Sequence, residues 1–196
     1  KLEIGHPPGA PFFMLMARFF TLFASDVHEV AKMVNIFSAF MSALTILFLF
    51  WTITHLARRL VIKAESDFTL GNTIAILGAG TVGALAYTFS DTFWFSAVEA
   101  EVYASSSMFT AIVFWAMLKW EDVADRPFAN RWLVLIAYLM GLSVGVHLLN
   151  LLSIPVLVLV YYFRKFKFSW KGVGISFAVS VVLLAVILYG IIPGFV

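Results

Sequence analysis

The stretch YTFSDTFWFSAVEAEVY, residues Tyr87–Tyr103, separates two long apolar segments and contains three acids, Asp91, Glu99 and Glu101. Apolar segments of this length predict membrane-spanning helices, so this stretch decides where one span ends and the next begins. It is itself rich in aromatic and aliphatic residues. We therefore expect its acids to face a protein cleft at the membrane edge, where they would take part in acid–base chemistry or hold a cation. A solvated loop at the membrane edge is the alternative.

The composition identifies the class of protein. Of the 196 residues, 62% are hydrophobic and only 12% are charged, and the mean hydropathy is +0.98. A soluble domain is about half apolar and about a quarter charged, so the chain is expected to be an integral membrane protein. A formal net charge of +2 is too small to indicate nucleic acid as a partner. Since the chain has no cysteine, disulfides, thiolate metal sites and cysteine nucleophiles are excluded.

The apolar segments predict an all-α, polytopic membrane helix bundle with about six transmembrane helices. The expected spans are Lys32–His55, Leu70–Phe89, Val102–Leu118, Trp132–Val146, Leu151–Phe163 and Val173–Ile192. Pro11–Ala24 is also apolar, but at about 1.5 Å per residue it is only about 20 Å long, whereas the hydrocarbon core is about 30 Å thick. We expect it to be an N-terminal interfacial helix.

We interpret residues 1–196 as a single transmembrane domain. An external loop with the interfacial helix would occupy residues 1–31, and the bundle would occupy residues 32–196. The chain starts with Lys1 rather than Met and ends in an apolar run. We therefore expect it to be part of a longer protein.

The segment Trp132–Phe163 leaves two arrangements open. As one helix it would be about 48 Å long, which is too long for one straight crossing and short for two. It is either a tight pair of helices turning near His147–Asn150, or one long tilted helix followed by an interfacial piece. We favour the pair, because it accounts for the distribution of charge.

With the helix pair, lysine and arginine gather on one side of the membrane. Ten fall there: Arg58, Arg59, Lys63, Lys119, Arg126, Arg131, Arg164, Lys165, Lys167 and Lys171. Only Lys1, Arg18 and Lys32 fall on the other side. By the positive-inside rule the basic side is cytoplasmic. A single crossing would place the last four cations opposite Arg131, which the rule disfavours.

The glycines of GAGTVG, Gly78, Gly80 and Gly83, match the dinucleotide-binding pattern G-x-G-x-x-G. That function requires a preceding strand in a βαβ unit, and this motif lies inside an expected membrane span. We interpret it as close helix packing through small residues, and Gly141 with Gly145 in the same way.

Polar residues gather on the side opposite the basic residues. His147 and Asn150 are three positions apart and would share a face if helical, so they would be either functional or paired with each other. His6 precedes two prolines, and an ordinary loop histidine is its alternative reading. For Tyr103, an interfacial anchor is the alternative reading. The sequence has no HExxH motif or clear His–carboxylate cage, so no metal ligands are assigned, and a divalent cation stays open as a cofactor.

Three segments resemble a known family. They are GHPPGAPFFMLMARFFTLFA (Gly5–Ala24), SDTFWFSAVEAEVYA (Ser90–Ala104) and GLSVGVHLLNLLSIP (Gly141–Pro155). The sequence is similar to the protein O-mannosyltransferase-like GT-C glycosyltransferases, in particular a bacterial branch, over essentially all of its residues. The combination of the HPPG and EAEVY segments is more specific than hydropathy alone.

The resemblance implies a membrane glycosyltransferase core that moves a mannose-like sugar from a polyprenyl-phosphate donor to an acceptor, expected to be a protein. The site would lie on the periplasmic face of a bacterial inner membrane. In the family, an acidic motif just upstream of the HPPG segment carries the catalytic carboxylate. That motif would precede Lys1, so no catalytic residue is assigned here, and the piece alone is expected to be inactive.

The resemblance also implies where substrate binds. The candidate substrate-binding residues are His6, Asp91, Glu99, Glu101, Tyr103, His147 and Asn150. Of these, His147 and Asn150 fit an H-x-x-N element at the external edge. Glu99 and Glu101 would help to place the donor phosphate or the acceptor, through hydrogen bonds or a metal ion.

Two other functions remain open. Intramembrane histidine and acids would also suit proton coupling in a transporter or flippase. No internal repeat is visible in the sequence, and the polar groups lie at one edge rather than the midplane, which favours the enzyme. A non-catalytic membrane scaffold is the third alternative. Membrane lipid is an expected partner in each case.

Overall fold

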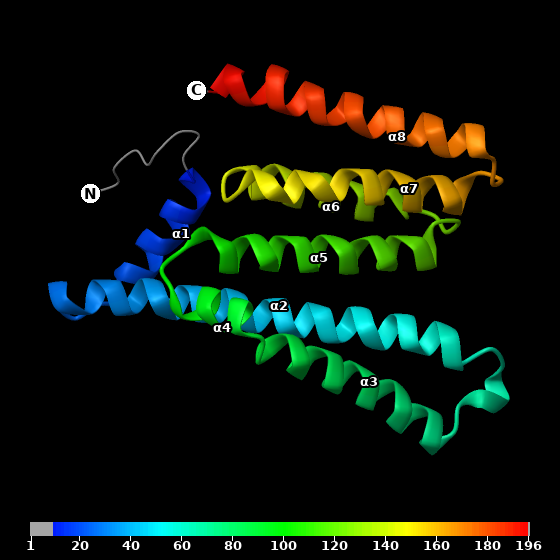
Figure 1. The fold of residues 1–196 in the computed structure, drawn as a ribbon, viewed down its shortest axis with the longest axis horizontal. Helices are drawn as coiled ribbons and strands as arrows, with labels where there is room; N and C mark the ends of the chain where they lie inside the picture. The colour runs from blue at the N-terminus through cyan, green and yellow to red at the C-terminus, as the bar shows by residue number, and fades with distance from the viewer. Residues whose placement is uncertain (1–9, 196) are drawn as a thin grey trace.

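The computed structural model describes residues 10–195, which form helices and turns without a strand (Figure 1). The helices are α1 (Pro11–Thr21), α2 (Val30–Val61), α3 (Leu70–Thr88), α4 (Asp91–Val98), α5 (Val102–Val123), α6 (Asn130–Val144), α7 (Ile154–Lys165) and α8 (Trp170–Ala185). Short 3-10 helices are η1 (Val27–Glu29), η2 (Glu65–Asp67), η3 (Leu148–Ser153) and η5 (Ile192–Phe195), and the π-helical turn η4 (Val186–Ile191) extends α8. The predicted all-α bundle is confirmed.

Within the described residues, five helices are long and apolar enough to cross a membrane. They cover Val27–Val61, Leu70–Thr88, Val102–Val123, Leu148–Lys165 and Trp170–Ile191. The sixth expected span, α6, has 15 residues, or about 22 Å of helix, and is shorter than the others. The chain is therefore a multi-pass membrane protein.

The helix pair predicted between Trp132 and Phe163 is confirmed, and the single tilted crossing is wrong. The end of α6 is closed by hydrogen bonds from Gly145 N–H and Val146 N–H to the carbonyls of Leu142 and Ser143. His147 then adopts an extended backbone, with φ −158°, and η3 leads into α7. Figure 1 shows α7 returning along α6 toward the opposite end of the bundle.

Helix α1 lies obliquely across one end of the bundle (Figure 1). The N–H groups of Phe12 and Phe13 donate to the carbonyl of Gly145, at 2.8 and 3.3 Å. The free N–H groups of one helix start thus meet a free carbonyl at the end of another. Phe13 and Phe37 pack at a ring separation of 5.7 Å in a buried cluster that joins α1, α2 and α5. The position suits the predicted interfacial helix, although α1 ends at Thr21 rather than Ala24.

Glycine lets α3 approach α2. A Cβ at Gly80 would lie 2.4 Å from Thr54 Cγ2, and one at Gly83 would lie 2.6 Å from Ile53 Cδ1. The packing interpretation of the GAGTVG motif is confirmed for these two glycines. It is wrong for Gly78, where a Cβ would meet nothing within 4 Å.

In the second glycine pair, Gly141 and Gly145, only one glycine allows a close helix contact. A Cβ at Gly145 would lie 2.9 Å from Phe12 Cβ, so Gly145 packs against α1 rather than against a second span. A Cβ at Gly141 would meet nothing within 4 Å, so the predicted packing is wrong there. The pair therefore makes one close contact instead of a continuous small-residue interface.

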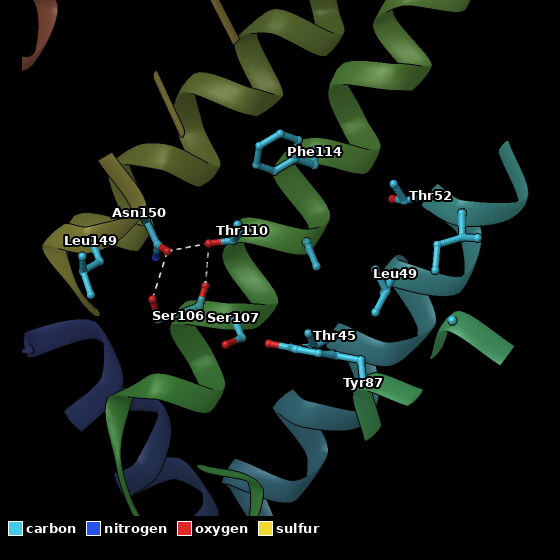
Figure 2. A pocket seen from close by; sticks show the side chains of 13 residues that line it. Thr45, Leu49, Thr52, Tyr87, Ser106, Ser107, Thr110, Phe114, Leu149 and Asn150 are labelled. Carbon is cyan, nitrogen blue, oxygen red and sulfur yellow. Dashed lines mark hydrogen bonds between the residues drawn. The ribbon is translucent and has the colours of Figure 1, made fainter. Parts of the chain in front are cut away.

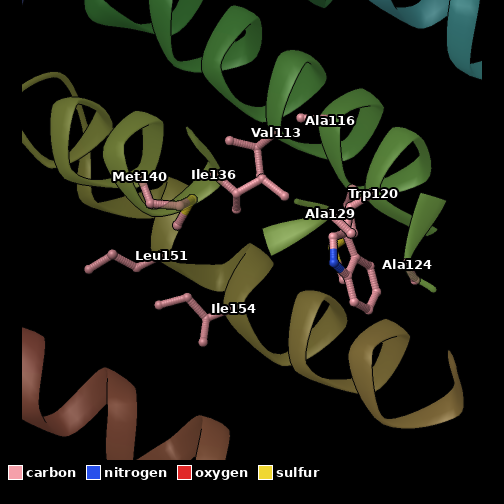
Figure 3. Close-up of a cluster of buried hydrophobic side chains, with 10 residues drawn as sticks. Val113, Ala116, Trp120, Ala124, Ala129, Ile136, Met140, Leu151 and Ile154 are labelled. Carbon is pink, nitrogen blue, oxygen red and sulfur yellow. The ribbon is translucent and has the colours of Figure 1, made fainter. Parts of the chain in front are cut away.

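The largest buried cluster joins α5, α6 and α7 (Figure 3). Its members are Val113, Ala116, Met117, Trp120, Ala124, Ala129, Ile136, Met140, Leu151 and Ile154. Trp120 is fully buried and stacks on Tyr161, with ring centroids 5.3 Å apart. This cluster fixes α7 against α5 and so determines where the turn before α7 meets α5.

The ends of the bundle differ in charge. Arg59 pairs with Glu121 at 2.7 Å and with Asp122 at 2.8 Å, and Lys165 pairs with Asp125 at 3.1 Å. These ion pairs lie where α2, α5 and α7 end together, on the right in Figure 1. We call this the basic end and the opposite one the outer end. Placing the basic end in the cytoplasm stays a prediction.

Candidate functional site

The three acids of the Tyr87–Tyr103 stretch lie around α4 at the outer end. Asp91 begins α4, whereas Glu99 follows its last residue and Glu101 directly precedes α5. Glu99 and Glu101 have extended backbones, with ψ of 147° and 159°, because the helix stops at Val98. Asp91 and Glu99 therefore do not share a helix face. Asp91 and Glu101 are exposed, and Glu99 is half-buried.

The carboxylates of these acids have no cationic partner in the described part of the chain, where the ion pairs lie at the basic end. Asp91 lines a separate groove of about 430 Å³ with Phe89, which follows α3, and with Trp94 and other side chains of α4. Among residues 10–195 no group of three His, Asp or Glu is placed to hold a metal ion. His6 lies outside the described residues.

His147 and Tyr103 meet at the outer end. Their ring centroids are 5.5 Å apart, and the planes are inclined by 47°. The Nδ1 atom of His147 accepts the N–H of Leu149 at 3.1 Å, which caps η3. Because Nδ1 accepts this bond, the neutral imidazole carries its proton on Nε2. The half-buried ring is thus held in one tautomer, with an N–H donor on the other nitrogen.

Asn150 is the most fully buried of the candidate residues within the described chain, with 4% of its surface exposed. Its Oδ1 atom accepts the hydroxyl of Ser106 at 3.0 Å and lies 2.7 Å from the hydroxyl of Thr110 (Figure 2). The Thr110 hydroxyl also reaches the Ser106 carbonyl at 3.1 Å, and with one proton it donates to one of the two at a time. The Nδ2 atom of Asn150 is buried and has no partner among the described residues.

The residues of α5 that contact His147 and Asn150 lie on one face of the helix. Tyr103, Ser106 and Thr110 stand at positions i, i+3 and i+7, which lie on one face of an α-helix. The predicted shared helix face of His147 and Asn150 is wrong, because His147 has an extended backbone and Asn150 belongs to the 3-10 helix η3. Both nevertheless face α5.

Asn150 opens onto a pocket of about 480 Å³ that we call the outer pocket. It is bounded by α2, α3, α5 and η3. Its polar lining is uncharged and comes from Thr45, Thr52, Tyr87, Ser106, Ser107, Thr110 and Asn150. Figure 2 shows the Tyr87 hydroxyl pointing toward Ser107. The rest of the lining is apolar and includes Leu49, Ile53 and Phe114, so most of the pocket surface is apolar. The few polar groups are neutral and suit an uncharged ligand that carries hydroxyl groups better than a charged one.

Aromatic packing joins the wall of the outer pocket to α4, because Tyr87 lines the pocket and Phe93 belongs to α4. The ring of Tyr87 lies 4.4 Å from that of Phe93, centroid to centroid, and Phe93 is 5% exposed. Phe93 thereby anchors α4, which carries Asp91, beside the pocket. The acids border the site and do not line it. Among the candidate residues that the structure describes, Asn150 is the one that lines it.

Neither a curated protein nor a solved structure matches the chain. A protein family does: residues 1–170 match the family described as protein O-mannosyl-transferase TMEM260 N-terminal domain. The match includes the Tyr87–Tyr103 stretch, the face of α5 that carries Ser106 and Thr110, and the turn that carries His147 and Asn150. Because it covers most of the 196 residues, the chain belongs to the protein O-mannosyl-transferase TMEM260 N-terminal domain family.

Proposed function

We propose that the chain forms the membrane core of a GT-C glycosyltransferase. The enzyme transfers a mannose-like sugar from a polyprenyl-phosphate donor to a protein acceptor on the non-cytoplasmic face, which for a bacterial protein is the periplasmic face of the inner membrane. Family membership supports a glycosyltransferase-like role. The observation that carries the substrate assignment is Asn150, which lines the uncharged outer pocket and whose buried Nδ2 has no partner among the described residues.

Asn150 would act as a fixed hydrogen-bond donor to the sugar. Its amide is oriented because Ser106 and Thr110 hold the oxygen. The Nδ2 atom is buried, so a small shift of the neighbouring side chains would be needed for a sugar to reach its N–H groups. A buried donor without a partner costs free energy, about 1–3 kcal/mol, that a sugar hydroxyl oxygen would recover on binding. The hydroxyls of Ser107 and Tyr87 would contact other hydroxyls of the same ring.

The proposed chemistry is displacement at the anomeric carbon of the sugar. An acceptor hydroxyl attacks that carbon, its bond to the phosphate oxygen breaks, and polyprenyl phosphate leaves with the electron pair. A general base takes the proton of the acceptor hydroxyl. By the family resemblance, that base is a carboxylate upstream of Lys1. Glu99 and Glu101 would place the donor phosphate or the acceptor, through hydrogen bonds or a bound cation.

The test is sugar transfer by membranes that contain the full-length protein. The donor is labelled polyprenyl-phosphate mannose, and label recovered in protein is counted. Asn150→Asp keeps the shape and the accepting oxygen of the side chain but removes the Nδ2 donor. We expect transfer to fall about tenfold, the value of one hydrogen bond.

Asn130→Asp is the matched control. It makes the same chemical change at the exposed first residue of α6, at the basic end, where an acid suits the helix start. Full transfer by a folded Asn150→Asp protein would contradict the sugar-binding role. Absence of transfer from several donor sugars, with the wild-type protein folded, would favour a transporter or a scaffold instead.

A further inference from the structure

The basic end contains a second pocket of about 670 Å³, between the last turns of α2, the α2–α3 loop, the end of α5 and the start of α6. We call it the basic pocket. Five cationic side chains line it: Arg58, Arg59, Lys63, Lys119 and Arg126. Only two acids, Glu65 and Asp122, line it with them. It therefore differs from the outer pocket, whose lining is uncharged.

Most of this positive charge is not neutralised by residues 10–195. Arg59 is paired with Glu121 and Asp122, and Asp122 also lies 3.6 Å from Nε2 of His55. The remaining cations of the pocket make no ion pair within residues 10–195. Asp67, the other acid of the α2–α3 loop, accepts the backbone N–H groups of Lys63 and Ala64, both at 2.8 Å. Glu65 is thus the one lining acid left to balance four cations.

Neighbouring groups hold several of these cations in place. The Nζ atom of Lys63 donates to the carbonyl of Arg59 at 2.6 Å. The guanidinium of Arg58 lies over the ring of Phe68, and the ammonium of Lys119 lies over the ring of Trp115, each 5.6 Å from the ring centroid. Cation–π contacts orient a charge without neutralising it. Like charges held around one pocket repel each other, and an anion with several acceptor oxygens would relieve that repulsion.

The surroundings of the basic pocket indicate a lipid as the source of that anion. Leu60 and Phe68, beside Arg58 and Lys63, are 76% and 58% exposed. They adjoin the end of α2, a membrane-spanning helix, so the cations stand at the depth of lipid headgroups with apolar surface next to them. Basic pockets between membrane helices are a recognised type of site for anionic headgroups. We propose that the basic pocket binds the phosphate headgroup of an anionic membrane lipid such as phosphatidylglycerol.

The experiment measures lipid bound to the purified full-length protein by native mass spectrometry. Phosphatidylglycerol and phosphatidylcholine with identical acyl chains are titrated separately. The wild type is expected to prefer phosphatidylglycerol, and excess inorganic phosphate is expected to leave the bound lipid in place. Arg58→Gln with Lys119→Gln should lower the affinity for phosphatidylglycerol about tenfold, because each cation near an anionic headgroup contributes to binding.

Lys167→Gln with Lys171→Gln is the matched control, since it removes the same charge at the same end from exposed residues that do not line the pocket. It should leave the affinity unchanged. An equal loss of affinity for phosphatidylglycerol in the two double variants would overturn the proposed site. Equal binding of phosphatidylglycerol and phosphatidylcholine by the wild type would overturn it too. Displacement by inorganic phosphate would identify a soluble phosphate as the ligand and overturn the lipid.

A gain of binding tests the proposal even if the Arg58 and Lys119 variant does not fold. Glu65→Gln removes the free acid from the pocket and leaves every cation in place. It should raise the affinity for phosphatidylglycerol severalfold without changing that for phosphatidylcholine. Unchanged or weaker binding of phosphatidylglycerol by this variant would overturn the site.

Discussion

The hydroxyl of Thr110 lies 2.7 Å from Oδ1 of Asn150, so α5 and the turn before α7 meet through polar groups inside an otherwise apolar bundle. Forty residues separate the two positions in the chain. The contact orients the Asn150 amide, and with it the donor that we assign to the sugar. It therefore couples the packing of the bundle to the proposed binding of substrate.

Thr110→Val should weaken both the packing of the bundle and the proposed binding of the sugar donor. Valine has nearly the same shape but cannot donate to Asn150, and hydrogen bonds between membrane helices contribute about 0.6–1.7 kcal/mol. We expect a lower unfolding temperature in detergent and a rise in the KM for the donor. Thr81→Val is the control, because the Thr81 hydroxyl bonds only the carbonyl of Leu77 in its own helix. Similar effects of the two changes would argue against a specific role for the Thr110 contact.

Glu99→Gln tests the acids beside the outer pocket. Glu99 is half-buried where α4 gives way to α5, and its charge would act on the donor phosphate through a bound cation, or on the acceptor. We expect sugar transfer by full-length protein to fall about tenfold or more, with little change in unfolding temperature. Glu65→Gln, the same change at the basic end, should leave transfer unaffected. Full activity of a folded Glu99→Gln protein would remove Glu99 from the site.

Gly80→Ala should loosen α3 from α2. The new methyl group would lie 2.4 Å from Thr54 Cγ2 and 2.9 Å from Phe50 Cε2, so these side chains or one of the helices must shift. Overpacking of this kind costs about 1–3 kcal/mol, which a lower unfolding temperature would report. Gly78→Ala should be neutral or slightly stabilising, since nothing lies within 4 Å.

A second-site change makes the Gly80 test specific. Thr54→Ser removes the clashing methyl group and keeps the hydroxyl that donates to the carbonyl of Phe50. It should restore part of the stability of Gly80→Ala. No rescue would mean that the strain lies elsewhere, for instance against Phe50.

Gly172→Ala should disrupt the turn between α7 and α8. The Tyr162 hydroxyl accepts the N–H of Ser169 at 2.9 Å and donates to the carbonyl of Lys167 at 3.0 Å. A Cβ at Gly172 would clash with the hydroxyl oxygen of Tyr162 and would displace the tyrosine ring. We expect a loss of about 2–3 kcal/mol, seen as a lower unfolding temperature. Gly174→Ala, in open space on the same helix, is the control.

Sequence alone was sufficient for the helical class, five of the six expected spans and the helix pair, because hydropathy and the positions of lysine and arginine carry that information. It identified Asn150 but not its partners, since contacts across 40 and 44 residues depend on how α5 and η3 pack. The serine run at 105–107 inside an apolar span was the available signal for Ser106. The sequence did not predict that residues 91–98 form a helix. That helix, α4, is held by the packing of Phe93 on Tyr87, a tertiary contact that local sequence patterns do not show.

Asp125→Asn should change how acid destabilises the protein. Hydrogen bonds from Lys165 and then from Arg164 hold the pKa of Asp125 below its ordinary value. A carboxyl group whose pKa is lower in the folded state stabilises the protein above the unfolded-state pKa. That stabilisation is lost as the pH falls through the folded-state pKa. The unfolding temperature of the wild type should therefore drop below about pH 4 by more than that of the variant.

Near neutral pH the wild type should be only slightly more stable than Asp125→Asn, because the ion pair is exposed and exposed pairs contribute little. High salt provides the internal control, since screening weakens exposed ion pairs. The two proteins should then respond to acid alike. A difference in acid sensitivity that persists in high salt would show that Asp125 acts through something other than its pairs with Lys165 and Arg164.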